Sequence, residues 1–201
     1  MKNLFFFICF CVSSFSYSQT DTTFVNLKYY SSEFVYDMKY ATDSNFFKEK
    51  VYDCGECYLR LKTINSLIEA NKKFIKKEYR IKLFDCYRPL DIQKKMWTIV
   101  SNPKYVANPE KGSIHNRGGA VDITLVDSDG NELDMGTPFD HFGEEAAHSY
   151  ENLTDIQKKN RKLLRKIMTK SNFQLFESEW WHYNLNDSKK EPLSNFKWKC
   201  N

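Results

Sequence analysis

Apolar residues recur at three- and four-residue spacing in two long parts of the chain. Over residues 59–77 this spacing predicts an amphipathic helix with a lysine-rich outer face. The sequence Thr-x-x-Gln at 154–157 matches a capping box and predicts that a basic helix begins there and runs to about residue 170. A shorter helix is predicted over residues 91–100. These segments account for the helical part of the fold.

Short runs of β-branched and aromatic residues predict four strands. Their ranges are 81–86, 120–126, 173–176 and 180–185. Pro89 ends the first, and the turn sequence at 127–130 closes the second. Residues 22–47 form an extended, aromatic-rich segment. Because strands and helices are interspersed without regular βαβ alternation, we expect an α+β fold with a mainly antiparallel sheet and helices packed on it.

Composition narrows the class of protein. The chain has 201 residues, of which 41% are hydrophobic, enough for one domain with a core and too many for a disordered protein. Its 30 basic and 26 acidic residues nearly cancel, which argues against a nucleic-acid partner. Only 4 histidines are present, so any imidazole chemistry must draw on them.

The first 18 residues have the features of a signal peptide. Lys2 is followed by an apolar run at 4–12, and small residues at 16 and 18 predict cleavage before Gln19. An uncleaved membrane anchor is the alternative. With cleavage, we expect residues 19–201 to form a single domain with no membrane span that is exported to the periplasm.

Four cysteines remain after the leader: Cys54, Cys57, Cys86 and Cys200. An even number in an exported chain indicates two disulfides, for which three pairings are possible. A zinc knuckle would need a second pair of Cys or His at short spacing, which the sequence lacks. Among the three pairings we prefer Cys57–Cys86 with Cys54–Cys200.

His115 and Asp122 lie on either side of a glycine pair that directly precedes the predicted strand at 120–126. His115 lies in the loop, and Gly118-Gly119 lets the backbone turn so that His115 can fold back towards Asp122. Strand alternation places Asp122 on the face opposite the Val-Ile-Leu core positions. Imidazole and carboxylate are both ordinary zinc ligands. Taken alone, the pattern is equally typical of a polar loop followed by a solvated strand.

A second polar pair, Glu179 and His182, is surrounded by aromatic residues. An unpaired carboxylate in such a setting is costly, and a metal-bound water is a plausible partner for it. Residues three apart on a regular strand point to opposite faces, so the two can share a site only if Glu179 lies in the preceding turn or at a bulge. The alternative is an aromatic core strand with a hydrogen-bonded histidine.

Together these residues suggest a catalytic zinc site. Two His and one Asp leave the open fourth position that a catalytic zinc needs, and Glu179 would act as the base. Arg88, at a strand end, would stabilise the oxyanion formed in amide hydrolysis; a surface arginine beside a turn proline is the commoner case. No His-Glu-x-x-His helix is present, which excludes a thermolysin-like protease.

The motifs resemble the D-alanyl-D-alanine dipeptidase family of zinc peptidases, which is related to D,D-carboxypeptidases. The resemblance rests first on Ser-x-His-x-x-Gly-x-Ala-x-Asp at 113–122, followed by Glu-x-x-His at 179–182. It extends to Tyr-Arg-Pro at 87–89, Lys-Tyr-Ala-Thr at 39–42, Asn-Phe at 45–46 and Met-Gly-Thr-Pro-Phe-Asp at 135–140. These matches occur in family order over roughly residues 35–185.

The resemblance implies a hedgehog/D,D-peptidase-like fold and a role for each motif. It implies one Zn²⁺ per chain, bound by His115, Asp122 and His182. It also implies that Glu179 is the catalytic base and that Arg88 stabilises the tetrahedral intermediate. The implied substrate is a small dipeptide, D-alanyl-D-alanine.

The resemblance further implies that Asp140 pairs with the substrate ammonium and that Tyr40 and Ser113 line the pocket. Such a carboxylate also makes chemical sense, because an enzyme restricted to dipeptides must favour a free amino terminus. Without the resemblance, a loop aspartate that caps a turn is the commoner case. One departure is Cys86 before Tyr-Arg-Pro, where the family has a small residue. Two histidines are left for structural or rim positions: His141 and His148.

Two other functions stay open. A D,D-carboxypeptidase or endopeptidase would trim peptidoglycan stems, but a long stem has no free ammonium for Asp140. A non-catalytic zinc-binding module would not need a base, so Glu179 argues against it.

Overall fold

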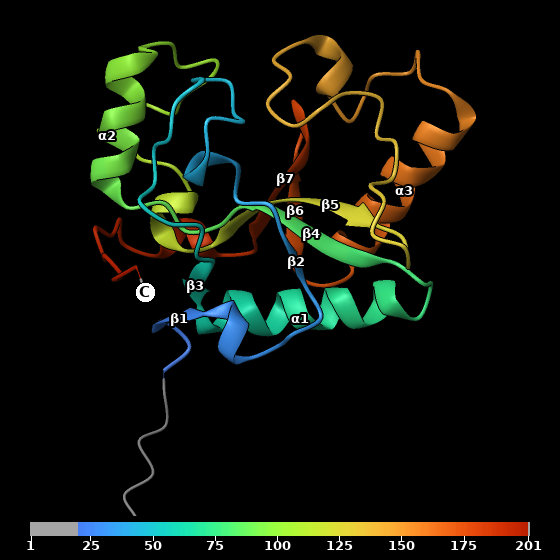
Figure 1. Ribbon diagram of the computed structural model, residues 1–201, viewed down its shortest axis with the longest axis horizontal. Helices are drawn as coiled ribbons and strands as arrows, with labels where there is room; N and C mark the ends of the chain where they lie inside the picture. Colours follow the sequence, from blue (N-terminus) through green and yellow to red (C-terminus); the bar gives the residue numbers. More distant parts are fainter. Residues whose placement is uncertain (1–19, 201) are drawn as a thin grey trace, which may run out of the picture.

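Figure 1 shows the computed structural model of the protein, which describes residues 20–200. The predicted leader and its cleavage point lie outside these residues. Within the described part, no helix has the length and apolar character needed to cross a bilayer.

A five-stranded sheet organises the molecule, in the order β2-β4-β5-β7-β6. The strands are β2 (Val35–Tyr36), β4 (Arg80–Asp85), β5 (Ala120–Val126), β7 (Glu179–Leu185) and β6 (Phe173–Phe176). Only the short edge strand β2 pairs in parallel; the other three pairings are antiparallel. A second, two-stranded sheet joins β1 (Phe24–Asn26) to β3 (Tyr58–Arg60). The expected α+β fold with a mainly antiparallel sheet is confirmed.

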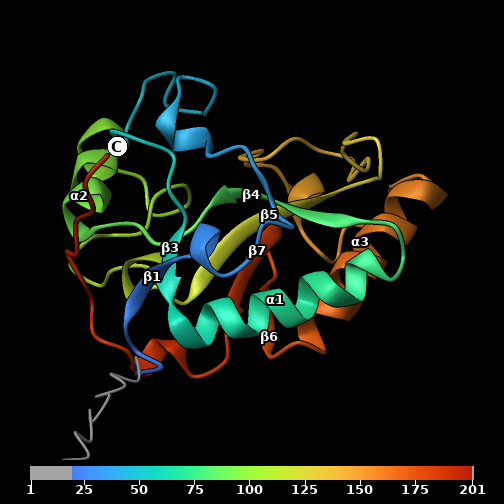
Figure 2. The same cartoon turned by 60° about the horizontal axis from the view of Figure 1, so that its bottom comes forward.

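The described residues contain three helices (Figures 1 and 2): α1 (Leu61–Ile75), α2 (Leu90–Ile99) and α3 (Asp155–Thr169). Helices α1 and α3 pack against strands of the sheet, and α2 lies to one side of it. The predicted capping box is present, because Thr154 accepts the Gln157 amide while the Gln157 side chain accepts that of Thr154. The first helix begins later than its pattern predicts, since residues 58–60 belong to β3. The extended segment at 22–47 contains only two short strands and two 3-10 turns.

Every residue of β5 is buried, so both faces of that strand are covered. Val121, Ile123 and Leu125 belong to the larger core, which also includes buried residues of α1 and α3. A smaller cluster of buried residues lies between α2 and residues 40–52, and Tyr40 and Met96 are among its members. Asp122 therefore faces away from the main core, as predicted, but onto a covered surface.

Two disulfides, Cys57–Cys86 and Cys54–Cys200, join distant parts of the chain. The first bridges the segment just before β3 to the end of β4, and the second ties the C-terminal tail to the loop before β3. Trp198 of the tail stacks on Tyr58, with ring centroids 5.3 Å apart. The preferred pairing of the cysteines is confirmed.

Candidate active site

The pairing of three strands brings two of the predicted ligands together. Asp122 on β5 lies opposite Asp85 of β4 on one side and opposite His182 of β7 on the other. A row of three polar residues therefore crosses the middle of the sheet. This register depends on a bulge between Leu83 and Asp85, which shifts the end of β4.

His115 reaches the same point from a 3-10 turn that precedes β5. The turn ends at Gly118, which has a φ of 70°, in the left-handed region that favours glycine. A Cβ at Gly118 would also collide with the ring of Phe24. The glycine pair thus folds His115 back towards Asp122, as the sequence predicts.

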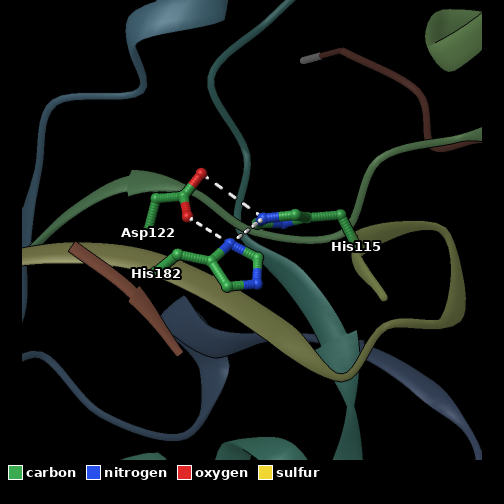
Figure 3. Close-up of side chains that lie close together, drawn as sticks. All are labelled: His115, Asp122 and His182. Atoms are coloured by element: carbon green, nitrogen blue, oxygen red, sulfur yellow. Dashed lines mark hydrogen bonds and ion pairs between the residues drawn. The ribbon is translucent and has the colours of Figure 1, made fainter. Parts of the chain in front are cut away.

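The donor atoms of His115, Asp122 and His182 converge on one point (Figure 3). His115 Nε2 lies 3.2 Å from His182 Nδ1 and 3.3 Å from Asp122 Oδ2, and His182 Nδ1 lies 2.9 Å from Asp122 Oδ1. Tetrahedral ligands about 2.0–2.1 Å from a zinc ion lie about 3.3 Å from one another. The spacing of these three donors therefore fits a zinc ion.

The hydrogen bonds of the imidazole nitrogens that face away from the proposed zinc position also fit a zinc site. His115 Nδ1 lies 2.6 Å from the carbonyl oxygen of Cys86, and His182 Nε2 lies 2.8 Å from Asn184 Oδ1. If each of these nitrogens carries the proton, the two inner nitrogens present lone pairs to each other. Two facing lone pairs beside a carboxylate favour a positive charge between them, as a proton or a metal ion would supply.

The electrostatics of the three groups agree with this need for positive charge. Burial favours the neutral form of Asp122, but the two imidazoles outweigh burial and lower its pKa. Burial likewise opposes the charged form of His182, yet its hydrogen bond to Asp122 raises its pKa to about 9. The carboxylate thus favours a positive charge at this point.

Glu179 shares the site with His182 because the β6–β7 hairpin is irregular. Phe176 pairs with Glu179, while Leu175 pairs with Tyr183, so residues 180–182 have no partner in β6. This bulge brings Glu179 Oε2 within 3.9 Å of His182 Nδ1. Burial raises the pKa of Glu179, and the opposing effect of His182 is smaller. Glu179 therefore lies at a bulge, as the strand pattern requires if Glu179 and His182 are to share a site.

Arg88 is fixed by buried side chains near the end of β4. Its guanidinium donates to Asp85 Oδ2 at 2.7 and 3.2 Å and to Gln93 Oε1 at 3.0 Å. Burial opposes the charge of Arg88, but Asp85 outweighs it and the pKa is raised well above its usual value. The Arg88 charge is therefore permanent and held in one orientation.

One cavity of about 760 Å³ joins all the predicted site residues, which are Tyr40, Arg88, Ser113, His115, Asp122, Asp140, Glu179 and His182. Tyr40 donates its hydroxyl to both oxygens of Asp140, at 3.0 and 3.1 Å. Burial and the charge of Asp122 raise the pKa of Asp140 well above its usual value. Neither His141 nor His148 is part of the lining.

Three supporting residues were not singled out from the sequence: Asp85, Gln93 and Asn184. Asp85 lies three residues before Arg88, and this spacing of a carboxylate and an arginine is a local signal from which the pair could be predicted. Asn184 lies two residues after His182, and strand alternation places both on one face. No local signal indicates Gln93, because its contact with Arg88 depends on how α2 packs.

The Glu179 carboxylate accepts no hydrogen bond within the described residues and lies beside the three converging ligand atoms. A partly buried carboxylate that does not stabilise the fold, next to such a group, points to a hydrolytic enzyme. The family model described as "D-ala-D-ala dipeptidase" matches residues 20–198. The chain belongs to this family of peptidases.

Individual relatives agree. A D-alanyl-D-alanine dipeptidase of Escherichia coli is 32% identical over 182 residues, which cover 90% of this chain and 94% of that protein. Proteins of the same name from Enterococcus faecium and Enterococcus faecalis are each 32% identical and cover 80% and 76% of this chain, respectively. The matched regions span 88% and 86% of the length of those two proteins, respectively.

Proposed function

We propose that the chain is an exported zinc-dependent dipeptidase that hydrolyses D-alanyl-D-alanine. The observation that carries this proposal is the convergence of His115, Asp122 and His182 beside Glu179 and Arg88 in one cavity. A zinc ion held by the three ligands would supply a Lewis acid and lower the pKa of a water molecule to about 7.

Glu179 would move the proton in this reaction. It would accept a proton from the attacking water and later donate it to the leaving amine. Burial raises its pKa, which brings the acid and base forms closer in energy near neutral pH. Its carboxylate accepts no hydrogen bond from the other described residues, so it is free to exchange a proton.

Arg88 would bind the carbonyl oxygen of the scissile bond, and Asp140 would bind the amino terminus of the substrate. The fixed guanidinium of Arg88 would stabilise the negative charge that develops on the carbonyl oxygen. Asp140 would bind the substrate ammonium, whose charge favours the ionised carboxylate despite the raised pKa. Tyr40 orients Asp140, and the Ser113 hydroxyl, which lines the cavity, would complete the substrate pocket.

Export to the periplasm is supported by two disulfides, because such bonds persist in oxidising compartments. If the leader is cleaved, the periplasmic protein should begin at Gln19, which its intact mass would reveal. Recovery of the uncleaved chain in the membrane fraction would favour the anchor instead.

A related D,D-carboxypeptidase is a second candidate. The cavity volume of about 760 Å³ exceeds what a dipeptide of about eleven non-hydrogen atoms needs and lies within the range of sites for drug-sized ligands. The Asp140 carboxylate favours the dipeptidase, since an acylated stem peptide brings no ammonium.

The test compares D-Ala-D-Ala with an N-acylated tripeptide ending in D-Ala-D-Ala, together with zinc content. The dipeptidase should prefer the free dipeptide, and Glu179→Gln should keep zinc while losing about 10²–10⁴-fold in kcat. Glu177→Gln, an exposed neighbour in the same hairpin, is the matched control and should stay active. Preference for the acylated peptide would overturn the substrate assignment. Zinc binding without hydrolysis of either peptide would favour a binding module.

A further inference from the structure

A second cavity, of about 550 Å³, lies between the middle of α3, at residues 158–165, and residues 148–153. None of the proposed catalytic or metal-binding residues lines it. Its charged and imidazole lining consists of Lys158, Arg161, Lys162, Arg165, His148 and Glu151. The cavity is thus strongly cationic, with a single carboxylate in its lining.

The four cations occupy one face of α3, because they are spaced three and four residues apart. The side chains of Lys158, Lys162 and Arg165 make no hydrogen bond or ion pair within residues 20–200. Like charges at this spacing repel one another, which destabilises a helix unless an anion offsets the repulsion. The arrangement therefore favours a negatively charged ligand.

Arg161 is the buried member of the group and is 6% exposed. It donates to the carbonyl oxygens of Met135, Glu145 and Ala147 at 2.6, 2.8 and 3.0 Å. No carboxylate within the described chain pairs with it, and burial lowers its pKa. The Trp180 ring, whose centroid lies 6.0 Å from the guanidinium carbon, and the charge of Asp134, which forms no ion pair with Arg161, compensate this charge only in part. An anion in the cavity would offset the rest.

His148 contributes a second unsatisfied group. Its Nε2 atom is buried and has no hydrogen-bond partner among the described residues. The backbone amide of His148 donates to the carbonyl oxygen of Glu177 at 2.8 Å, which fixes the residue beside the β6–β7 hairpin. A ring N–H at this nitrogen would be a ready donor to an oxyanion.

We propose that this cavity binds a multiply charged oxyanion of the phosphate class, with Arg161 and His148 beneath it and Lys158, Lys162 and Arg165 around it. Four cations against one carboxylate match a ligand with more than one negative charge. Guanidinium groups bind phosphate oxygens through paired donors, and ammonium groups add point charges. The free anion and a phosphate group carried by a lipid share this chemistry.

Calorimetric titration of the zinc-loaded, exported chain with inorganic phosphate and pyrophosphate, at constant ionic strength, tests the proposal. Pyrophosphate should bind with a dissociation constant of about 1 mM or tighter. The double variant Lys162→Gln/Arg165→Gln should weaken binding at least about tenfold. Lys166→Gln/Lys170→Gln removes the same charge from the C-terminal end of α3 and from its capping residue, outside the cavity, and should leave binding unchanged.

Two further arms identify the binding place and the source of the phosphate group. His115→Ala should retain pyrophosphate binding, because a loss there would place the anion at the zinc site and overturn the proposal. Flotation with phosphatidylglycerol vesicles, against phosphatidylcholine vesicles, tests a lipid headgroup; vesicle binding that is lost in the Lys162→Gln/Arg165→Gln variant would identify the lipid as the source. If neither pyrophosphate nor vesicles bind, or if the cavity variant binds both unchanged, the proposal is wrong.

Discussion

The two walls of the active-site cavity hold their charges in different ways. The first wall, formed by β4, β5 and the turn at His115, fixes each group through several buried contacts. Asp85 is fully buried and accepts hydrogen bonds from Tyr52, from Arg88 and from the amide of Cys86. The Cys57–Cys86 disulfide anchors the same strand end.

The second wall, formed by the turn of the β6–β7 hairpin at residues 176–179 and by residues 135–147, holds its charges loosely. His182, further along β7, is fixed by Asp122 and Asn184 and belongs with the first wall. The Glu179 carboxylate accepts no hydrogen bond within residues 20–200, and Phe176 beside it is 46% exposed. Asp140 has a φ of 61° and depends on one side chain, that of Tyr40. The pKa values of Glu179 and Asp140 are raised, whereas that of Asp122 is lowered.

This difference follows the work proposed for each wall. Hydrogen bonds to a carboxylate stabilise its charged form and would make it a poor proton acceptor. A group that exchanges protons benefits from having few donors, while a ligand or an oxyanion-binding group benefits from a fixed position. The first wall therefore supplies geometry, and the second supplies groups whose charge changes during the reaction.

The largest effect should come from loosening the first wall at Arg88. Arg88→Lys keeps the charge but loses the planar fork that Asp85 and Gln93 hold, so kcat should fall about 10²–10³-fold. Asp85→Asn should cause a loss of similar size, because it releases the guanidinium without touching substrate. Steady-state kinetics on D-Ala-D-Ala would measure both.

Arg80→Lys, at the other end of β4, is the control and should leave kcat unchanged. Zinc content should be the same in all three variants. Full activity in Asp85→Asn would show that Arg88 does not depend on Asp85 for its position.

The two disulfides should contribute similarly to stability but differently to activity. Removing either one as a Cys→Ala pair should cost about 2–4 kcal/mol of the free energy of unfolding. Only Cys57→Ala/Cys86→Ala should also lower kcat, because the Cys86 carbonyl orients His115 and the next residues lead to Arg88. Denaturant titration and kinetics of both double variants would check this. Equal activity losses in the two pairs would contradict the distinct role of the first wall.

Much of the fold could be predicted from the sequence because its signals are local. The strands Ala120–Val126 and Phe173–Phe176 and the capped start of α3 follow from alternation and from the Thr-x-x-Gln sequence. The parallel pairing of β2 could not be predicted, since two residues carry no periodicity and their partner is distant in the chain. The same holds for β3, whose three residues directly precede a helical pattern.

The site was predictable to the extent that its residues carry chemistry in compact motifs. His115, Asp122, Glu179 and His182 lie in two short segments, and strand alternation indicated their faces. The sequence shows only that Glu179 must lie in a turn or at a bulge if it shares a site with His182. It does not predict the bulge at residues 180–182 itself, because that bulge depends on pairing with β6. Support from Gln93 and from the Cys86 carbonyl depends on tertiary packing, which one sequence does not reveal.

The smallest effect concerns the support of the second wall by His148. Burial, together with Arg165 and Arg161 and against the charge of Glu177, lowers the pKa of His148 to about 4. The unfolded chain, with a pKa of about 6.5, therefore binds a proton that the folded protein does not, and stability falls as the pH drops from about 6.5 towards 4.

At pH 5 this proton linkage should cost about 2 kcal/mol of the free energy of unfolding. His148→Gln removes the titrating group, so its stability should fall less than that of the unmodified protein between pH 7.5 and pH 5. Urea titrations at both pH values measure the difference, and the other histidines cancel because both proteins contain them. His141→Gln, at a partly exposed histidine paired with Glu145, is the matched control. If the His148 variant and the unmodified protein lose the same stability, His148 is protonated in the folded state and does not stabilise the hairpin in its neutral form.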